Sequence, residues 1–357
     1  MKQRISRMSS NTKESNSSST SYQQMNPDSR IIQIEDGTCD AGGSHSPTSL
    51  LCSMQAGSPR PGSSDGTMSI DAPPPTFTES FKSYITNPYL AIELAVCVLV
   101  GALGHFAPGY VFRLPLNERD IPYQITANGD VILDQYINRP LVEKETIPDW
   151  LLLVLSFVSP LIIVVVSGAM SPIRNDLHAA TCTLFFAMGS TEFITSFVKL
   201  YAGYLRPNFY SYCGFSEDIM ACESDSNDPR KSFPSGHAAS SFCSMTLLTL
   251  LFFGKIGLHR GLWSSGGNGV TGEASRGPAY YIKKRILSMF AAMPMFLAVF
   301  IAASRVHDNM HHPADITAGA IIGIFCAVFG YGLWYPSIYS SFAGFPLQTS
   351  FEIMAMH

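Results

Sequence analysis

A short stretch that begins at Ser304, SRVHDNMHHPAD, gathers histidines and charged residues at the edge of an apolar segment. Asp315 follows His311 by four residues, so a helix that begins near Pro313 would bring both side chains onto one face. The carboxylate of Asp315 could then accept the Nδ1 proton of His311 and leave Nε2 with a free lone pair. The pattern therefore selects His311 as the reactive histidine.

The two neighbouring histidines fit this role less well. On the same helix His312 would point about 100° away from His311. His307 has no carboxylate at a comparable downstream spacing. We expect His312 to pack within the loop or to touch a lipid head group. His307 is expected to be solvated, or else to lie at the periphery of the site.

Two further clusters supply groups that bind anions. Lys199 and Arg206 are seven residues apart, which is about two helical turns and places both cations on one face. The stretch Pro234–Ser235–Gly236–His237 precedes another apolar segment, and a helix that starts there would direct unpaired N–H groups outward. Alone, a cation pair at a span end commonly reaches for lipid head groups. Together with Arg305, the clusters contain what is needed to hold a phosphate group and cleave its ester.

The elements that must position these clusters are membrane spans. Charged residues make up 14% of the chain, against about 25% in an average soluble domain. The apolar residues collect in runs of about 20, which is the length that crosses a bilayer core. We predict an all-α bundle of six spans. They cover Pro88–Pro108, Ile147–Val166, Leu177–Val198, Ala238–Phe253, Ile286–Ala303 and Ile316–Trp334.

Basic residues set the predicted orientation, because positive charge is retained in the cytoplasm. The loop after the fourth span is basic, with Lys255, Arg260, Arg276, Lys283, Lys284 and Arg285. The loop after the first span is acidic, with Glu118, Asp120, Asp130, Asp134, Glu143 and Glu145. Both termini are therefore expected in the cytoplasm. All three polar clusters then lie on the lumenal or outer face.

The predicted domain occupies residues 81–336, between two cytoplasmic tails. Residues 1–80 are rich in Ser, Gly, Pro and Asn and cannot bury enough apolar surface to fold, so we predict a disordered tail. Residues 337–357 form the second tail. We expect an integral multi-pass protein of the endoplasmic reticulum, the vacuole or the plasma membrane. The sequence does not indicate its oligomeric state.

The three clusters together resemble the type 2 phosphatidic acid phosphatase superfamily, in its lipid phosphate phosphatase branch. That superfamily is marked by K-x6-RP, PSGH and SR-x5-H-x3-D. The chain reads Lys199–Arg206–Pro207, Pro234–Ser235–Gly236–His237, and Ser304–Arg305 with His311 and Asp315. The sequences RKSFPSGH and TIPDW are also similar to eukaryotic lipid phosphatases. The resemblance covers about Pro88 to Trp334.

The resemblance implies a mechanism. His311 attacks phosphorus and forms a phosphohistidine, while His237 protonates the leaving alkoxide and later activates water. The phosphate is held by Lys199, Arg206, Arg305, the Ser235 hydroxyl and backbone N–H groups near Ser235 and Gly236. Ser304 orients its neighbours. Three cations would stabilise the equatorial oxygens as Mg²⁺ does in other phosphoryl transfers, so no metal or other cofactor is expected.

The implied substrates are phosphate monoesters of lipids in the bilayer: phosphatidate, lysophosphatidate, diacylglycerol pyrophosphate or sphingoid phosphates. A polyisoprenyl pyrophosphate phosphatase is the alternative within the enzyme class, and a membrane scaffold or transporter is the alternative outside it. Nucleic acid is not an expected partner. A zinc site at His307, His311 and Asp315 is disfavoured by the neighbouring cations. The glycine-rich segment near Gly267 lacks the Lys-Ser/Thr of a nucleotide loop and is predicted to be a linker.

Two smaller predictions concern residues away from the motifs. Cys213 and Cys222 lie in one predicted extracytoplasmic loop and are expected to form a disulfide. Glu93 and Glu192 lie within predicted spans, and ionisable residues there are usually functional. Because the catalytic set lies elsewhere, we expect these two to make interhelical hydrogen bonds.

Overall fold

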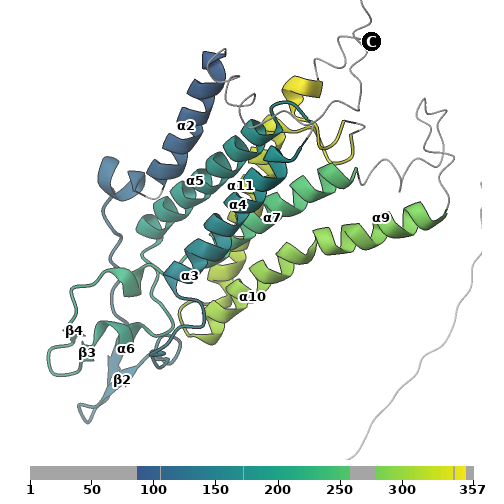
Figure 1. Cartoon of the computed structure of the whole chain (residues 1–357). Helices are drawn as coiled ribbons and strands as arrows, with labels where there is room; N and C mark the ends of the chain where they lie inside the picture. The colour runs from purple at the N-terminus through teal and green to yellow at the C-terminus, as the bar shows by residue number, and fades with distance from the viewer. Residues whose placement is uncertain (1–86, 105, 172, 258–277, 341, 351–357) are drawn as a thin grey trace, which may run out of the picture. The chain divides into compact units, whose positions relative to one another are not determined.

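The computed structural model describes residues 87–104, 106–171, 173–257, 278–340 and 342–350. The described residues are mostly helical, as the composition predicts (Figure 1). The predicted disordered tail and the glycine-rich linker lie outside these residues.

The apolar segments form helices close to the predicted positions. Those long and apolar enough to cross a membrane, among the described residues, are Asp149–Ala169, Asp176–Ala202 (α5), Gly236–Ile256 (α7), Pro278–His307 and Pro313–Trp334 (α11). The helix Pro88–Gly104 (α2) is apolar but has 17 residues, so within the described part of the chain five helices, and not the six predicted, are long enough and apolar enough to cross a membrane. Even so, 17 residues is about the lower limit for a span. Several helices extend past the predicted apolar runs, because polar residues at a helix end continue the hydrogen-bond ladder.

Two of the long helices are interrupted where proline enters them. The first contains α3 (Asp149–Leu153), a π turn η3 (Val154–Val158) and α4 (Ser159–Ala169). Pro160 has no N–H to donate to the preceding turn, and the wider π turn accommodates this loss. The second consists of α9 (Pro278–Ala291) and α10 (Met293–His307), with Pro294 in the first turn of α10. A similar π turn, η2 (Ala107–Val111), follows α2.

Helix α7 is central and packs most extensively against α11, and also against α10 and α5. Close approach of α7 and α11 depends on two glycines spaced four residues apart, Gly319 and Gly323. A Cβ at Gly319 would overlap the Ser235 carbonyl, and one at Gly323 would overlap the Ala239 carbonyl. Small residues at this spacing allow helix backbones to touch inside a membrane. The contact fixes the start of α7, where Ser235 and His237 lie, against the start of α11.

The two acidic residues within the bundle make interhelical contacts, which confirms the prediction for them. Glu93 of α2 accepts a hydrogen bond from Trp334 of α11 at 2.8 Å and pairs with His178 of α5 at 3.0 Å. Glu192 of α5 accepts a hydrogen bond from Ser240 of α7. Such bonds satisfy polar groups that lipid could not.

The loops carry two antiparallel hairpins that the sequence analysis did not predict. Strand β1 (Tyr123–Ile125) pairs with β2 (Val131–Leu133), and β3 (Phe215–Ser216) pairs with β4 (Ala221–Cys222). A short helix α6 (Phe209–Cys213) and a 3₁₀ turn η4 (Asp228–Arg230) lie between α5 and α7. A disulfide joins Cys213 and Cys222, with 5.2 Å between their Cα atoms.

The C-terminal segment packs against the end of the bundle at which α7 and α11 end. Residues 342–350 fold back on it, with the Thr349 hydroxyl bonded to the Arg174 carbonyl at 3.0 Å. Beside them Lys255 forms an ion pair with the buried carboxylate of Asp176, which also accepts a hydrogen bond from Tyr335 at 2.9 Å. The described part of the predicted C-terminal tail is therefore packed against the helices.

Candidate active site

The three sequence clusters meet at one end of the bundle, which we call the motif end. Lys199 lies near the end of α5, His237 at the start of α7, Arg305 near the end of α10 and His311 just before α11. Direct contacts link the clusters: the Ser235 N–H donates to the Asp315 carbonyl at 3.0 Å. Helices that run in opposite directions thus bring residues more than 100 positions apart into one site.

His311 is held in one orientation by a backbone carbonyl. Its ring is 3% exposed, and its Nδ1 lies 2.7 Å from the carbonyl oxygen of Ser232. A carbonyl can only accept a hydrogen bond, so the proton of the neutral ring is on Nδ1. The lone pair is therefore on Nε2.

Asp315 does not make the contact expected from the sequence. Its nearer oxygen is 3.7 Å from the His311 Nδ1, too long for a good hydrogen bond. That oxygen instead accepts hydrogen bonds from the Ser232 hydroxyl at 2.5 Å and from the His312 N–H at 2.9 Å. Asp315 is fully buried and caps the start of α11. It therefore orients His311 through Ser232, and not by direct contact.

The surroundings of His311 keep the ring neutral. Burial lowers the pKa of His311 to about 4; the nearby carboxylate of Asp315 opposes this shift, while the charges of Arg206 and Lys199 add to it. Below its pKa the ring is protonated and Nε2 has no lone pair. The reactive form is therefore present above about pH 4 and lost as the pH falls through that value.

Removal of one neighbouring cation should shift the acidic limb of the pH–rate profile, which is the fall in rate at low pH. Arg206→Gln takes away a positive charge that lowers the pKa of His311, so the acidic limb of the kcat/KM profile is expected to shift to higher pH. Ionisation of the substrate is common to both enzymes, so the shift reports on the enzyme. Arg139→Gln is the matched control, because Arg139 is an exposed cation at the same end. An unmoved or downward-shifted limb in the Arg206 variant would contradict this assignment.

Lys199 and Arg206 approach the other two motifs from α5 and the loop after it. A Cβ at Gly236 would lie 3.2 Å from the Lys199 Nζ, so the glycine leaves room for the ammonium group beside the start of α7. The Arg206 Nε donates to the Asp228 carbonyl at 2.9 Å, and the Arg206 Nη1 lies 3.4 Å from the Met310 carbonyl. The first motif therefore contacts both the second and the third.

The start of α7 provides fewer free donors than the sequence suggested. The Ser235 N–H is already bonded to the Asp315 carbonyl, so it is not free for a phosphate. The Ser235 hydroxyl accepts a hydrogen bond from the Ala238 N–H at 3.4 Å and can still donate its own proton. Gly236 and His237 lie in the first helical turn, where N–H groups have no intrahelical acceptor. These two N–H groups remain as backbone donors that could bind an anion.

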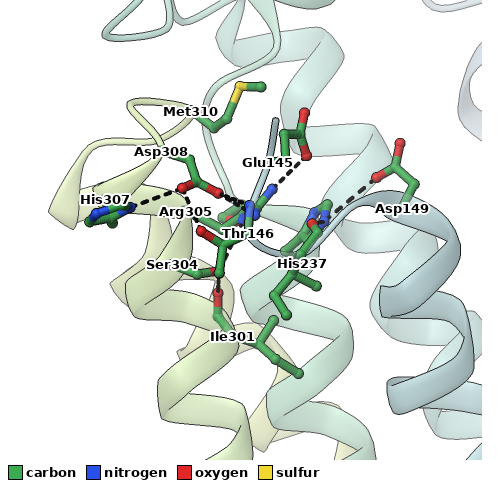
Figure 2. A network of polar contacts seen from close by, with 12 residues as sticks. Glu145, Thr146, Asp149, His237, Ile301, Ser304, Arg305, His307, Asp308 and Met310 are labelled. Carbon is green, nitrogen blue, oxygen red and sulfur yellow. Dashed lines mark hydrogen bonds and ion pairs between the residues drawn. The ribbon is translucent and has the colours of Figure 1, made fainter. Parts of the chain in front are cut away.

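Arg305 is buried between two carboxylates, as Figure 2 shows. Its Nη1 donates to Glu145 at 2.9 Å and its Nη2 donates to Asp308 at 2.8 Å. Asp308 also accepts hydrogen bonds at 2.7 Å from both the N–H and the hydroxyl of Thr146. Burial alone would raise the pKa of Asp308. The hydrogen bonds from His307 and Thr146 and the charge of Arg305 oppose this effect and hold the pKa below its usual value. The Ser304 hydroxyl lies 3.3 Å from the Arg305 Nε.

His237 is oriented by the same segment that contacts Arg305. Its Nε2 lies 3.1 Å from the Ile147 carbonyl and 3.6 Å from a carboxylate oxygen of Asp149 (Figure 2). Since the carbonyl accepts, Nε2 carries a proton and Nδ1 is the remaining ring nitrogen. Residues 145–149, just before and at the start of α3, therefore contact both His237 and the group around Arg305.

The other two histidines of the stretch are placed differently from each other. The His312 ring is buried and stacks on Tyr136, with 4.4 Å between ring centroids. The His307 side chain is 82% exposed and pairs with Asp308 at 3.0 Å. Among the described residues, no group of three His, Cys, Asp or Glu side chains is arranged to hold a metal ion.

Sequence reasoning missed Ser232, Glu145, Thr146 and Asp308. Asp308 follows Arg305 by three residues, a spacing at which helical side chains pair, so this contact could have been found. Ser232 contacts His311 through its carbonyl, which every residue has, and its hydroxyl contact with Asp315 spans 83 residues. Glu145 and Thr146 lie about 160 residues before Arg305, and no local pattern connects them.

Comparison with known proteins agrees with this geometry. The family model of the PAP2 superfamily matches residues 180–339. Lipid phosphate phosphatase 1 of Arabidopsis thaliana is 32% identical over 55% of this chain and 57% of its own length. The Arabidopsis protein named Probable lipid phosphate phosphatase 4 is 30% identical over 61% of this chain and 67% of its own. Diacylglycerol pyrophosphate phosphatase 1 of Saccharomyces cerevisiae is 27% identical over 58% and 71%. No solved structure matches significantly.

The chain belongs to the PAP2 superfamily. The matched region contains all three motifs, and the names of these relatives support an enzyme of the lipid phosphatase class. The apolar helices fit an integral membrane protein. The chain covers 57% of the length of the first of these relatives.

Proposed function

We propose that the chain is a membrane enzyme that hydrolyses phosphate monoesters of lipids through a phosphohistidine intermediate. The supporting observation is a buried, neutral His311 whose Nδ1 is bound to the Ser232 carbonyl, so that the lone pair on Nε2 is free. Three cations lie at the same end of the bundle, Lys199 and Arg206 from the first motif and Arg305 from the third, and the charges of Lys199 and Arg206 act on His311. A nucleophile with a lone pair beside phosphate-binding cations is the arrangement that phosphoryl transfer needs.

The proposed reaction has two steps. In the first, the His311 Nε2 forms a bond to phosphorus, the ester P–O bond breaks, and His237 gives a proton to the departing alkoxide. In the second, His237 takes a proton from water, the water oxygen bonds to phosphorus, and the N–P bond to His311 breaks. Lys199, Arg206 and Arg305 stabilise the charge on the equatorial oxygens throughout. Asp315 acts on the nucleophile through Ser232.

The substrate class follows from the position of the site at the ends of apolar helices. A lipid phosphate can remain in the bilayer while its head group reaches the motif end, so we propose phosphatidate, lysophosphatidate, diacylglycerol pyrophosphate or sphingoid phosphates. The yeast relative's name favours including the pyrophosphate. A polyisoprenyl pyrophosphate is the alternative substrate, and competition between the two substrate types on purified protein distinguishes them. A scaffold or transporter is less favoured, because every motif residue is present.

A direct assay tests the proposed activity and its independence of metal. The purified full-length chain should release inorganic phosphate from phosphatidate in detergent micelles, at the same rate with and without excess EDTA. The physical reason is that three protein cations supply the charge stabilisation. Loss of all activity in EDTA, with recovery on adding one particular divalent metal, would overturn the mechanism.

We further propose that the motif end faces the lumen or the outside, in the endoplasmic reticulum, the vacuole or the plasma membrane. The support is the basic loop that starts at Lys255, which lies at the opposite end of α7 from His237. Glycosylation acceptors inserted at Asn128 should therefore be modified in cells, and those inserted at Gly267 should not. Modification at Gly267 but not at Asn128 would place the site in the cytosol.

A further inference from the structure

The two carboxylates that flank Arg305 are held very differently. Asp308 is 1% exposed and accepts hydrogen bonds from Arg305, from the N–H and hydroxyl of Thr146 and from His307. The Glu145 side chain is 31% exposed, and its bond to Arg305 is its only side-chain hydrogen bond among the described residues. One carboxylate is therefore fixed in the protein, while the other can rotate out toward solvent.

The phosphate of a substrate needs the same donors that Glu145 uses. A guanidinium binds a carboxylate and a phosphate with the same planar set of N–H groups. In the structure the Arg305 Nη2 is bonded to Asp308, and the Nε faces the Ser304 hydroxyl. The Arg305 Nη1 bonds Glu145, and it is the nitrogen whose partner can leave at the lowest cost.

We propose that Glu145 is an internal anion that occupies Arg305 in the resting site and is displaced by the phosphate of the substrate, while Asp308 keeps the guanidinium in position. This inference rests on the proposed function, because it takes Arg305 as a phosphate ligand. It also gives Nη1 of a cation that is 1% exposed a partner between turnovers. Glu145 thus acts as a competitor that the substrate must replace.

The displacement needs only a side-chain rotation. The residues that follow Glu145 remain attached, because Thr146 is bonded to Asp308 and the Ile147 carbonyl to His237. Figure 2 shows Thr146 beside Asp308, and Asp149 of the same segment paired with His237. The backbone near His237 can therefore stay in place when the Glu145 carboxylate leaves, and the catalytic geometry is preserved.

The test compares the affinity of the site for inorganic phosphate in matched variants of the full-length protein. Glu145→Gln keeps the shape of the side chain and removes its charge. Glu143→Gln is the control, since Glu143 is an exposed carboxylate two residues away. If Glu145 blocks Arg305 in most molecules, its loss should lower the inhibition constant of phosphate and the KM by about 3–10-fold, with kcat little changed. The control should match the wild type.

Asp308→Asn provides the opposite expectation. Loss of this charge loosens Arg305, so the inhibition constant of phosphate should rise about tenfold or more, as for other lost charge-assisted bonds. Thermal unfolding of each variant checks that it folds. An unchanged or higher inhibition constant in Glu145→Gln, with or without a fall in kcat, would overturn the proposal and make Glu145 a support for Arg305.

The two proposals fail in different ways. If the wild type releases no phosphate from lipid yet binds inorganic phosphate in a calorimetric titration, the proposed function is wrong and the comparison of variants still tests the displacement. If the wild type hydrolyses lipid phosphates and Glu145→Gln does not tighten phosphate binding, only the displacement is wrong. A wild type that neither binds nor releases phosphate contradicts both.

Discussion

Replacement of His311 with alanine is expected to abolish both turnover and the first chemical step with every substrate. The supporting geometry is the Nδ1 bond to the Ser232 carbonyl, which leaves the nucleophilic lone pair on Nε2. Removal of a covalent nucleophile costs on the order of 10⁶-fold in kcat in a well-studied hydrolase. A loss of that scale, about 8 kcal/mol in activation free energy, is expected here.

The measurement is phosphate release together with trapping of acid-labile phosphoenzyme from labelled substrate. The wild type should accumulate label and the His311→Ala variant should not. His307→Ala is the matched histidine control, since its ring is 82% exposed and contacts Asp308 only from outside. We expect less than about a tenfold loss from that exposed contact. Labelled phosphoenzyme that persists in the His311 variant would require a different nucleophile.

The arrangement of the helices could be predicted largely from the sequence, because burial in a membrane imposes a simple rule on composition. Apolar runs of about 20 residues are needed to cross the bilayer. Each predicted run overlaps an observed helix, with ends that differ by several residues. The first helix shows the limit of this rule. Its apolar run continues past Gly104, but the regular helix ends there and a π turn that contains Pro108 follows.

The site could be predicted as a set of residues but not as a set of contacts. Motif spacing selected His311, Asp315 and Arg305 as candidates, because chemistry constrains side-chain type, and the structure brings these residues to one end of the bundle. It did not identify the Ser232 carbonyl, since backbone groups leave no trace in side-chain identity. It also paired Asp315 directly with His311 from helical spacing. That rule fails here because His311 lies just before the helix and not within it.

The contacts of Arg305 illustrate a second limit. A cation in a phosphate site is expected to be free, and the sequence offers no reason to place a carboxylate from a distant loop on it. The structure brings Glu145 to it from a loop about 160 residues away. Long-range pairs of this kind depend on how a loop crosses the end of the bundle, which neither hydropathy nor motif spacing specifies.

Replacement of His237 with alanine should separate the two steps of the proposed reaction. Loss of a general acid usually costs 10²–10⁴-fold in rate, and less when the leaving group needs no proton. An activated aryl phosphate has such a leaving group. The His237→Ala variant should therefore release about one equivalent of aryl alcohol in a burst and then stall. It stalls because no residue remains to activate water against the phosphohistidine on His311.

The experiment is a rapid burst assay of both histidine variants with the same aryl phosphate. The burst in His237→Ala should coincide with acid-labile phosphoenzyme, and the His311→Ala variant should show neither. This division of roles belongs to the proposed mechanism; the His237 Nε2 is bonded to the Ile147 carbonyl, while the His311 Nε2 has no hydrogen-bond partner among the described residues. Steady turnover of the aryl phosphate by His237→Ala would show that another group activates water. A burst from His311→Ala instead would exchange the roles of nucleophile and acid.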